Sequence, residues 1–141
     1  MKLLKSLMGQ AALILLACTT DAVASDDILV TRDSCAAVAS SAISASARAT
    51  SVEALRQRTK AAYLELAKAP GVRLLPLHKI EDPIDVVLDT YGGQILDQVR
   101  GGMHSSNLEQ VVHGIGYAMA FTSATCMAIL LDPPKQAPAR Q

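Results

Sequence analysis

Residues 34–49 read SCAAVASSAISASARA, and this run of small side chains decides the predicted fold. Val38 and Ile43 are its only larger apolar residues, and Asp33 or Ser34 can cap its first turn. Small side chains allow two helix backbones to approach closely. We therefore predict a first helix over about residues 34–49 that packs tightly against other helices.

Capping signals divide the following chain into three more helices. TSVE at residues 50–53 and SNLE at residues 106–109 fit the capping box, in which a hydroxyl and a Glu carboxylate bind helix-terminal N–H groups. Asp82-Pro83 is another start signal, because Pro at the first helical position loses no hydrogen bond. The expected helices cover about residues 51–69, 83–100 and 107–131, which predicts an all-α, small four-helix up-down bundle.

Gly and Pro residues predict where these helices end. Pro70-Gly71 is expected to end the second helix and Gly101-Gly102 the third. Residues 72–81 then form an extended connection that buries Leu74, Leu77 and Ile80. Gly92-Gly93, inside the third helix, indicates a kink or a close helix contact.

Cys35 and Cys126 are predicted to form a disulfide that staples the bundle. They are the two cysteines that remain once an N-terminal leader is removed, and export places them where disulfides persist. Closing a loop of this length contributes at most about 4–5 kcal/mol in the chain-entropy model. Two buried reduced thiols are the alternative. Since the bridge needs both helix ends at one pole, it favours a break in the chain near Thr50.

The fourth helix carries small residues at every fourth position. Gly116, Ala120, Ala124 and Ala128 form this stripe. Together with the small residues of the first helix, it predicts close packing between the first and last helices. The fourth helix is also apolar enough over residues 111–131 to raise a membrane-spanning alternative. A bundle helix is preferred, because His113 and several Gly and hydroxyl residues offset the insertion energy.

Residues 1–24 have the pattern of a cleaved signal peptide. Lys2 and Lys5 precede a short apolar run, and AVA at residues 22–24 suits a signal peptidase. An alternative is lipoprotein cleavage before Cys18, which would anchor the chain to the outer membrane. Residues 25–132 are then a single helical domain, and the Pro-rich tail at 133–141 is expected to be disordered. The expected location is periplasmic or secreted.

Charge and motifs exclude several kinds of activity. The chain has 13 basic and 13 acidic residues without a basic block, which argues against nucleic-acid binding. No haem, zinc or phosphate-binding motif is present, so no cofactor, metal or catalytic residue is predicted. The best constellation, Glu109 and His113 facing Asp85 and Asp89, is a weak metal candidate. Arg56, Arg58 and Lys60 are interpreted as a solvated face.

An exported helical domain without catalytic machinery is expected to work by binding. The predicted function is a non-enzymatic protein-binding module, such as an envelope inhibitor or immunity protein, or an accessory factor of a secretion or assembly system. Its partner would be another envelope or secreted protein, contacted through residues 70–82 and 101–106. Membrane contact is expected only if Cys18 is lipidated, and the oligomeric state is left open. The alternative is a small-ligand or lipid-binding protein of the periplasm.

Overall fold

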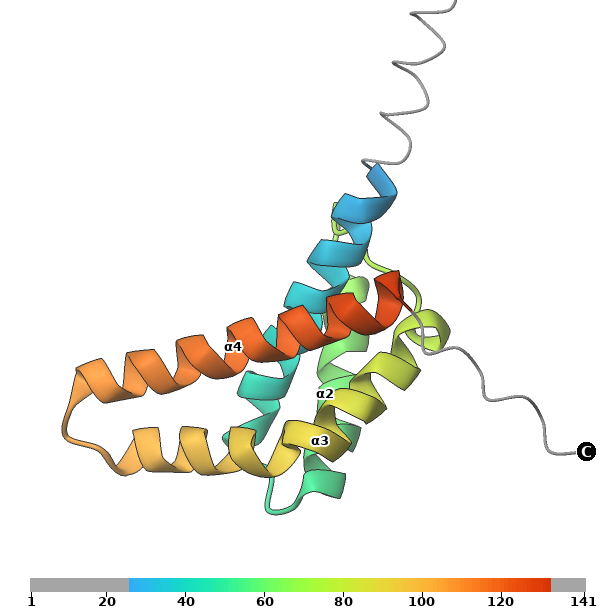
Figure 1. Cartoon of the computed structure of the whole chain (residues 1–141). Coiled ribbons are helices and arrows are strands. Elements are labelled where there is room, and N and C mark those ends of the chain that lie inside the picture. The colour runs from blue at the N-terminus through green and yellow to red at the C-terminus, as the bar shows by residue number, and fades with distance from the viewer. Residues whose placement is uncertain (1–25, 133–141) are drawn as a thin grey trace, which may run out of the picture. The chain divides into compact units, whose positions relative to one another are not determined.

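Helices joined by short connections make up residues 26–132, the part of the chain that the computed structural model describes, and no strand occurs among them. The chain divides into two compact units, residues 1–30 and residues 31–141, and the described residues of the first unit are helical. The second unit contains helical residues 31–46, then α2 (Val52–Ala67), α3 (Leu77–His104) and α4 (Leu108–Leu131) (Figure 1). The all-α prediction is confirmed. The predicted leader with Cys18 and the predicted tail at 133–141 lie outside the described residues.

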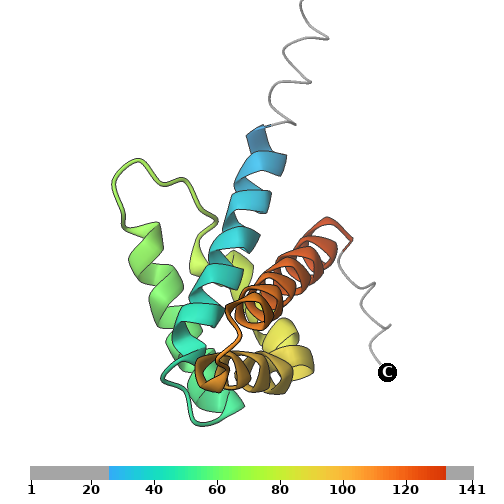
Figure 2. The same cartoon turned by 90° about the vertical axis from the view of Figure 1, so that its left-hand side faces the viewer.

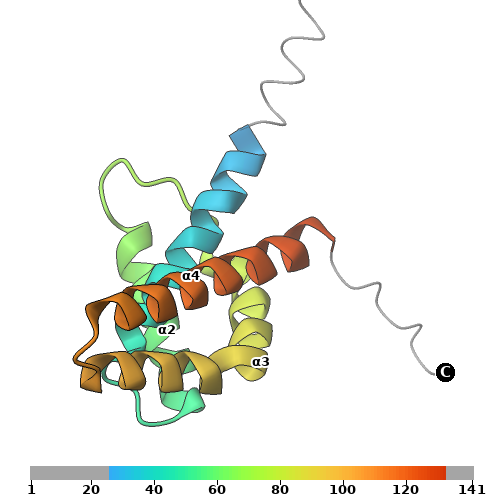
Figure 3. The same ribbon diagram turned by 60° about the vertical axis from the view of Figure 1, so that its left-hand side comes forward.

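The helix of small residues is a central element of the core. Figures 2 and 3 both show residues 31–46 with α2 on one side and α4 on the other. The predicted cap at Asp33 or Ser34 is wrong, because residues 26–32 contain no Gly or Pro and are already helical. The helix ends at residue 46, where the Ser46 hydroxyl donates to the Ile43 carbonyl oxygen at 2.6 Å. Its buried residues are Ser34, Cys35, Val38, Ala39, Ser41, Ala42, Ala45 and Ser46.

The predicted break near Thr50 is present, but the helix cap is one residue later than expected. Ser51 is the N-cap of α2, and its hydroxyl oxygen accepts a hydrogen bond from the Ala54 N–H at 3.1 Å. The carboxylate of Glu53 binds Arg56 and Gln57 instead of closing a capping box. The helix therefore depends on one capping side chain, while Glu53 joins a surface ion-pair network.

The predicted start of α3 at Asp82-Pro83 is wrong. The helix begins at Leu77 with Pro76 as its N-cap, and the Lys79 N–H donates to the Pro76 carbonyl oxygen at 2.9 Å. Pro83 lies inside the helix and is buried, so packing compensates for the hydrogen bond that its missing N–H cannot make. At the other end α3 continues through Gly101-Gly102 to His104.

A three-residue connection turns the chain from α3 into α4. Asn107 is the N-cap, in place of the expected Ser106, and its side-chain oxygen accepts from the Glu109 N–H at 3.0 Å. The Ser105 hydroxyl also accepts from the Asn107 N–H at 3.1 Å. Figures 1 and 3 show α4 lying beside the second half of α3. The end of α4 at Leu131 agrees with the prediction.

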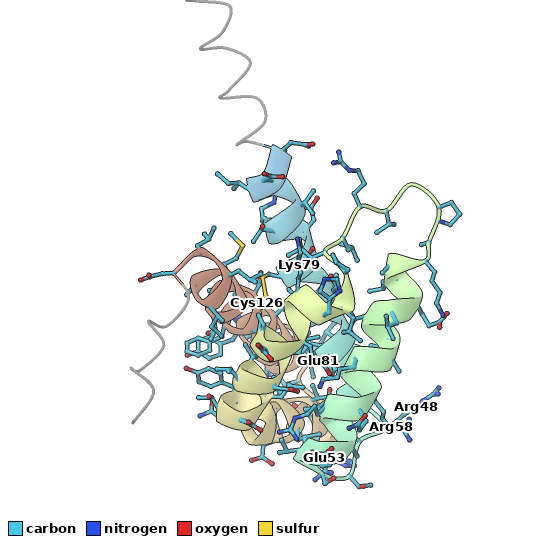
Figure 4. All side chains as sticks on the ribbon, turned by 90° about the vertical axis from the view of Figure 1, so that its right-hand side faces the viewer. Arg48, Glu53, Arg58, Lys79, Glu81 and Cys126 are labelled. Carbon is cyan, nitrogen blue, oxygen red and sulfur yellow. A yellow bond between two sulfur atoms is a disulfide. The ribbon has the colours of Figure 1, made fainter. Side chains whose placement is uncertain are left out.

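The Cys35–Cys126 disulfide is confirmed and joins the first helix of this unit to α4. The two Cα atoms are 5.6 Å apart, and both cysteines are fully buried. Figure 4 shows the sulfur–sulfur bond at Cys126. Helix α2 packs against α3, and α3 against α4, in the order of an up-down bundle. The largest fully buried side chains of the helices after the first are Tyr63, Leu55, Ile80, Ile84 and Leu88.

Gly92 allows α3 to approach the start of α2 closely. A Cβ atom added at Gly92 would lie 2.9 Å from Cγ1 of Val52, whereas one added at Gly93 would meet nothing within 4 Å. The close helix contact that the Gly pair predicted is thus present at Gly92, where α3 meets Val52 of α2. Figure 1 shows α3 changing direction part-way along its length, and Gly pairs are a recognised cause of such bends.

Alanine at these two neighbouring positions is expected to have opposite effects. Gly92→Ala should lower the free energy of unfolding by about 1–2 kcal/mol, because the stiff Val52 side chain must move. Gly93→Ala should raise it by up to about 1 kcal/mol, because Ala is the better helix former and nothing opposes its methyl group. Denaturant unfolding of both variants measures this. Equal effects at the two positions would contradict the contact.

Loss of the disulfide should destabilise the protein by about 2–5 kcal/mol. The comparison is denaturant unfolding of the oxidised protein with and without reductant, beside the Cys35→Ala/Cys126→Ala double variant. Reductant should shift the wild-type midpoint and leave the double variant unchanged. If the wild-type midpoint did not respond to reductant, the bridge would contribute nothing to stability.

Candidate functional site

The fourth helix buries one narrow side and exposes the rest. Its buried residues are Ala118, Thr122 and Cys126, which are spaced by four along the helix. A window of 18 residues within α4 has a mean hydropathy of 1.6, yet only 17% of that window is buried. By length and composition this helix could cross a membrane. The helix packs in the bundle as predicted, but most of its apolar surface remains accessible.

The stripe of small residues lies on this accessible side. Gly116, Ala120, Ala124 and Ala128 are all exposed, and nothing lies within 4 Å of a Cβ atom added at Gly116. The first helix and α4 do meet within the described residues, but they do so at Cys35 and Cys126, on another side of α4 from this stripe. Gly114 lies toward α3 instead, because a Cβ there would meet the end of the flexible Gln98 side chain, 2.8 Å from its oxygen.

Exposed apolar residues surround the stripe and form what we term the α4 apolar face. A helical period of 3.6 residues places them on one side of the helix. Tyr117 and Val112 are 65% and 62% exposed, and Leu131 is 59% exposed. No Asp, Glu, Lys or Arg occurs between Val112 and Leu131. The face consists of Val112, Gly116, Tyr117, Ala120, Ala124, Ala128 and Leu131, and the exposed side chain of His113 lies on the same side near its start.

Three of the four aromatic side chains of the chain gather between α3 and α4. Tyr91 on α3 meets Phe121 on α4 edge to face, with ring centroids 4.6 Å apart and an interplanar angle of 83°. Tyr117, one turn before Phe121, stacks on it at 5.7 Å. Sequence analysis did not identify this cluster. The four-residue spacing of Tyr117 and Phe121 was the signal, because it places both rings on one side of a helix.

A cavity of about 340 Å³ opens beside these rings, and we term it the α3–α4 cavity. The three aromatic rings line it together with Gln94, Asp97 and other residues of the two helices. A second hollow along the same pair of helices shares Asp97 and Gln98 with it and extends to Gly101, Gly102, Ser105 and Gln110. Among the described lining residues of the two hollows there is one acidic residue, Asp97, and no basic one.

A network of ion pairs joins the other side of α3 to α2. Arg56 pairs with Glu53 and with Asp85 and Asp89 on α3. Lys60 pairs with Asp85 and Glu81, each at 2.9 Å. The interpretation of Arg56 and Lys60 as a solvated face is therefore wrong. Four-residue spacing on both helices was the signal, since it aligns a basic row with an acidic row.

The remaining basic residues of this region do extend into solvent. Figure 4 shows Arg48 and Arg58 pointing away from the helices, and both are exposed. Arg58 thus agrees with the predicted solvated face, whereas its neighbours two residues away on α2 do not.

The ion-pair network also keeps apart the two pairs of residues that formed the weak metal candidate. Asp85 and Asp89 face α2, while Glu109 and His113 are exposed on the first turns of α4. Among residues 26–132 no group of three or more His, Cys, Asp or Glu side chains is placed to hold a metal ion. The structure does not bring these four residues together.

The segment after α2 is tied to the core, which limits its use as a recognition loop. The Tyr63 hydroxyl donates to the Leu75 carbonyl oxygen at 2.7 Å, and the Leu75 N–H donates to the Ser34 hydroxyl oxygen at 2.8 Å. Only residues 70–73 are exposed in succession, because α3 begins at Leu77. Of the segments predicted as contact loops, residues 77–82 and 101–104 belong to α3, so only residues 70–76 and 105–106 are loop. Burial raises the pKa of Tyr63, and its hydrogen bond with Ser34 opposes this in part.

The comparisons with known proteins add no relative. The chain matches no protein-family model, no curated protein and no solved structure. The candidate surfaces that the geometry offers are the α4 apolar face and the α3–α4 cavity beside it.

Alkaline pH should destabilise the protein through Lys60 and Tyr63. Burial alone lowers the pKa of Lys60, but hydrogen bonds and charge attraction from Glu81 and Asp85 outweigh this and raise it above 10.5. The stability that Lys60 contributes is complete below that pH and is lost as the pH rises through its folded pKa. The pKa of Tyr63 is raised above 10.0, so its phenol ionises at a lower pH in the unfolded chain than in the folded protein. The stability that Tyr63 contributes is therefore also lost as the pH rises.

Lys60→Met isolates the lysine contribution, with Lys68→Met as its matched control. Lys68 makes only an exposed pair with Glu65, so its loss should change stability little. At neutral pH Lys60→Met should lower the free energy of unfolding by about 1–2 kcal/mol. Above pH ~10 its stability should fall less steeply than that of the wild type. Parallel pH profiles for Lys60→Met and wild type would contradict the network.

Proposed function

We propose that the protein acts outside the cytoplasm as a non-enzymatic helical module that binds another envelope or secreted protein through the α4 apolar face. One observation carries this proposal: a side of α4 that has no Asp, Glu, Lys or Arg keeps the large apolar residues Val112, Tyr117 and Leu131 exposed. Exposed apolar patches mark interaction sites, since they cost free energy in water. An envelope inhibitor, an immunity protein or an accessory factor of a secretion or assembly system would each use such a surface.

The leader pattern and the disulfide support a periplasmic or secreted location. An intramolecular disulfide is weak support for an oxidising compartment, where such bonds persist. The signal-peptide pattern of residues 1–24 points to the same compartment. Lipid attachment at Cys18 would anchor the chain to the outer membrane.

The partner element is an apolar helix with basic residues at its ends. Gly116, Ala120, Ala124 and Ala128 lie along the middle of the α4 apolar face, so a second helix can approach its backbone closely. The charged residues that bound the face are both acidic, Glu109 near its start and Asp132 at its end. Lys or Arg at the ends of the partner helix would complement these charges.

The same charges disfavour a second copy of this chain and an anionic bilayer. Pairing two α4 helices brings acidic ends together in either direction, because both ends carry a carboxylate. A face lying on an anionic bilayer needs a basic rim, and the acidic ends are repelled there. A spanning α4 would carry Asp97 of the adjacent α3 into hydrocarbon at a cost of about 3 kcal/mol.

The α3–α4 cavity favours a second candidate function, small-ligand binding. Its volume of about 340 Å³ is within the range of ligand pockets, and aromatic rings with a few polar groups are typical linings. This candidate function corresponds to the alternative from the sequence, a ligand-binding protein of the periplasm. It needs no protein partner, so it can be tested separately.

A photo-crosslinking residue at Ala124 tests the protein-binding proposal, with one at Ala61 as the matched control. Both alanines are exposed on helices, but Ala61 lies on α2, away from the α4 apolar face. After illumination of cells that export the protein, mass spectrometry should map adducts from Ala124 to an apolar helical segment bounded by Lys or Arg. Ala61 should give at least tenfold less of the same adduct.

Three outcomes would overturn the proposal. Adducts of the Ala124 position to lipid alone would assign the face to a bilayer. Adducts to a second copy of the chain, together with a dimer mass in light scattering, would make it a self-association surface. Equal adducts from Ala124 and Ala61 would show that the face has no specific partner.

A further inference from the structure

The residues that line the α3–α4 cavity favour a ligand of one particular charge. Its residues come from facing sides of two helices that pack side by side, with Gln94 and Asp97 from α3 and Tyr117 and Phe121 from α4. The inference that follows rests on the small-ligand candidate function. It specifies which class of small molecule the cavity takes.

Two ring planes meet nearly at right angles at this cavity. Tyr91 and Phe121 are inclined by 83°, and Tyr117 lies beside Phe121 at an interplanar angle of 21°. Phe121 is 38% exposed and Tyr117 is 65% exposed, so their rings are not covered by the core. The faces of aromatic rings carry negative electrostatic potential and attract cations, and perpendicular rings can do so from two sides.

Asp97 gives the cavity a negative charge that has no ion-pair partner among the described residues. It is exposed, it lines both hollows along the helix pair, and it forms no hydrogen bond or ion pair with another residue in 26–132. This differs from Asp85 and Asp89 on the same helix, which both pair with basic residues of α2. No Lys or Arg is among the described residues that line the two hollows.

Uncommitted hydrogen-bonding groups complete the lining. The Gln94 amide and the hydroxyls of Tyr91 and Tyr117 bind no other side chain or backbone group within the described part of the chain. They can therefore bind a hydroxyl or another polar group on a ligand. With about 340 Å³, the cavity is at the small end of the range for ligand sites, which suits a compact molecule and not a lipid chain.

We infer that the α3–α4 cavity binds a small organic cation, a substituted ammonium of about the size of choline. The ring faces of Tyr117 and Phe121 contact its alkyl groups, and the Asp97 carboxylate balances its charge. A quaternary ammonium suits this lining, because it is weakly hydrated and makes its contacts with ring faces instead of through N–H donors.

Phe121 provides a specific readout, because it is the only Phe in the chain. In protein labelled with 13C at Phe, every labelled ring signal belongs to this cavity. Choline chloride is titrated into the oxidised protein, with sodium chloride holding the ionic strength constant. Choline should shift the Phe121 signals along a saturating curve. The uncharged isostere 3,3-dimethyl-1-butanol has the same shape and should bind at least about fivefold more weakly.

Asp97→Asn and Asp82→Asn form a matched pair that tests the carboxylate. Both aspartates are exposed on α3, but Asp82 lies about four turns before Asp97 and is not part of the cavity lining. Asp97→Asn should weaken choline binding about fivefold, and Asp82→Asn should leave it unchanged. Neither carboxylate makes a contact within the described fold, so both variants should keep the wild-type unfolding midpoint.

The outcomes separate this inference from the candidate function on which it rests. Equal binding of choline and the uncharged isostere, or unchanged binding in Asp97→Asn, would overturn the choice of a cation and leave a small-ligand site. If neither compound shifted the Phe121 signals, both the inference and the small-ligand function would fail. The protein-binding proposal depends on the Ala124 adducts and would stand in either case.

Discussion

The fold depends on the close packing of a helix made almost entirely of Ala and Ser. Residues 34–46 bury small side chains that offer little apolar area per residue, so they stabilise the fold only where neighbouring helices come very near. The bond between Cys35 and Cys126 fixes one such approach covalently. The remaining helices then supply the large side chains, among them Leu55, Tyr63 and Ile84, which fill the space around this thin central element.

Local signals predicted the features of the chain that local chemistry controls. The number of helices, the break near Thr50 and the end of α4 follow from caps, Gly and Pro, and the structure agrees with them. The start of α3 could not be predicted in this way. Asp82-Pro83 is a good helix start in isolation, but burial of Ile80 and Pro83 favours a helix that begins one and a half turns earlier. Tertiary packing decided between two acceptable local choices.

The candidate site was harder to predict, because α4 is apolar on all sides. Without polar periodicity the sequence does not indicate which side faces the core, and the stripe at Gly116, Ala120, Ala124 and Ala128 is on the accessible one. The rows of side chains that pair between helices could have been found from their four-residue spacing in the sequence. Tyr117 and Phe121, like the acidic row on α3, repeat every four residues. Which helix each row faces depends on the rotation of the helix, and no local residue pattern records that rotation.

The free energy needed to open the α3–α4 pair differs between its two ends. At one end Cys126 is buried and covalently bound, while at the other the helices are joined by residues 105–107 and meet through Gly102 and Val111, neither fully buried. Opening the second end breaks few apolar contacts, so it costs much less free energy than global unfolding. Amide protons near residue 108 should therefore exchange through local fraying, and those around Cys126 only when the whole core opens. The ends of α3 and α4 next to residues 105–107 can therefore open locally while the core around Cys126 stays folded.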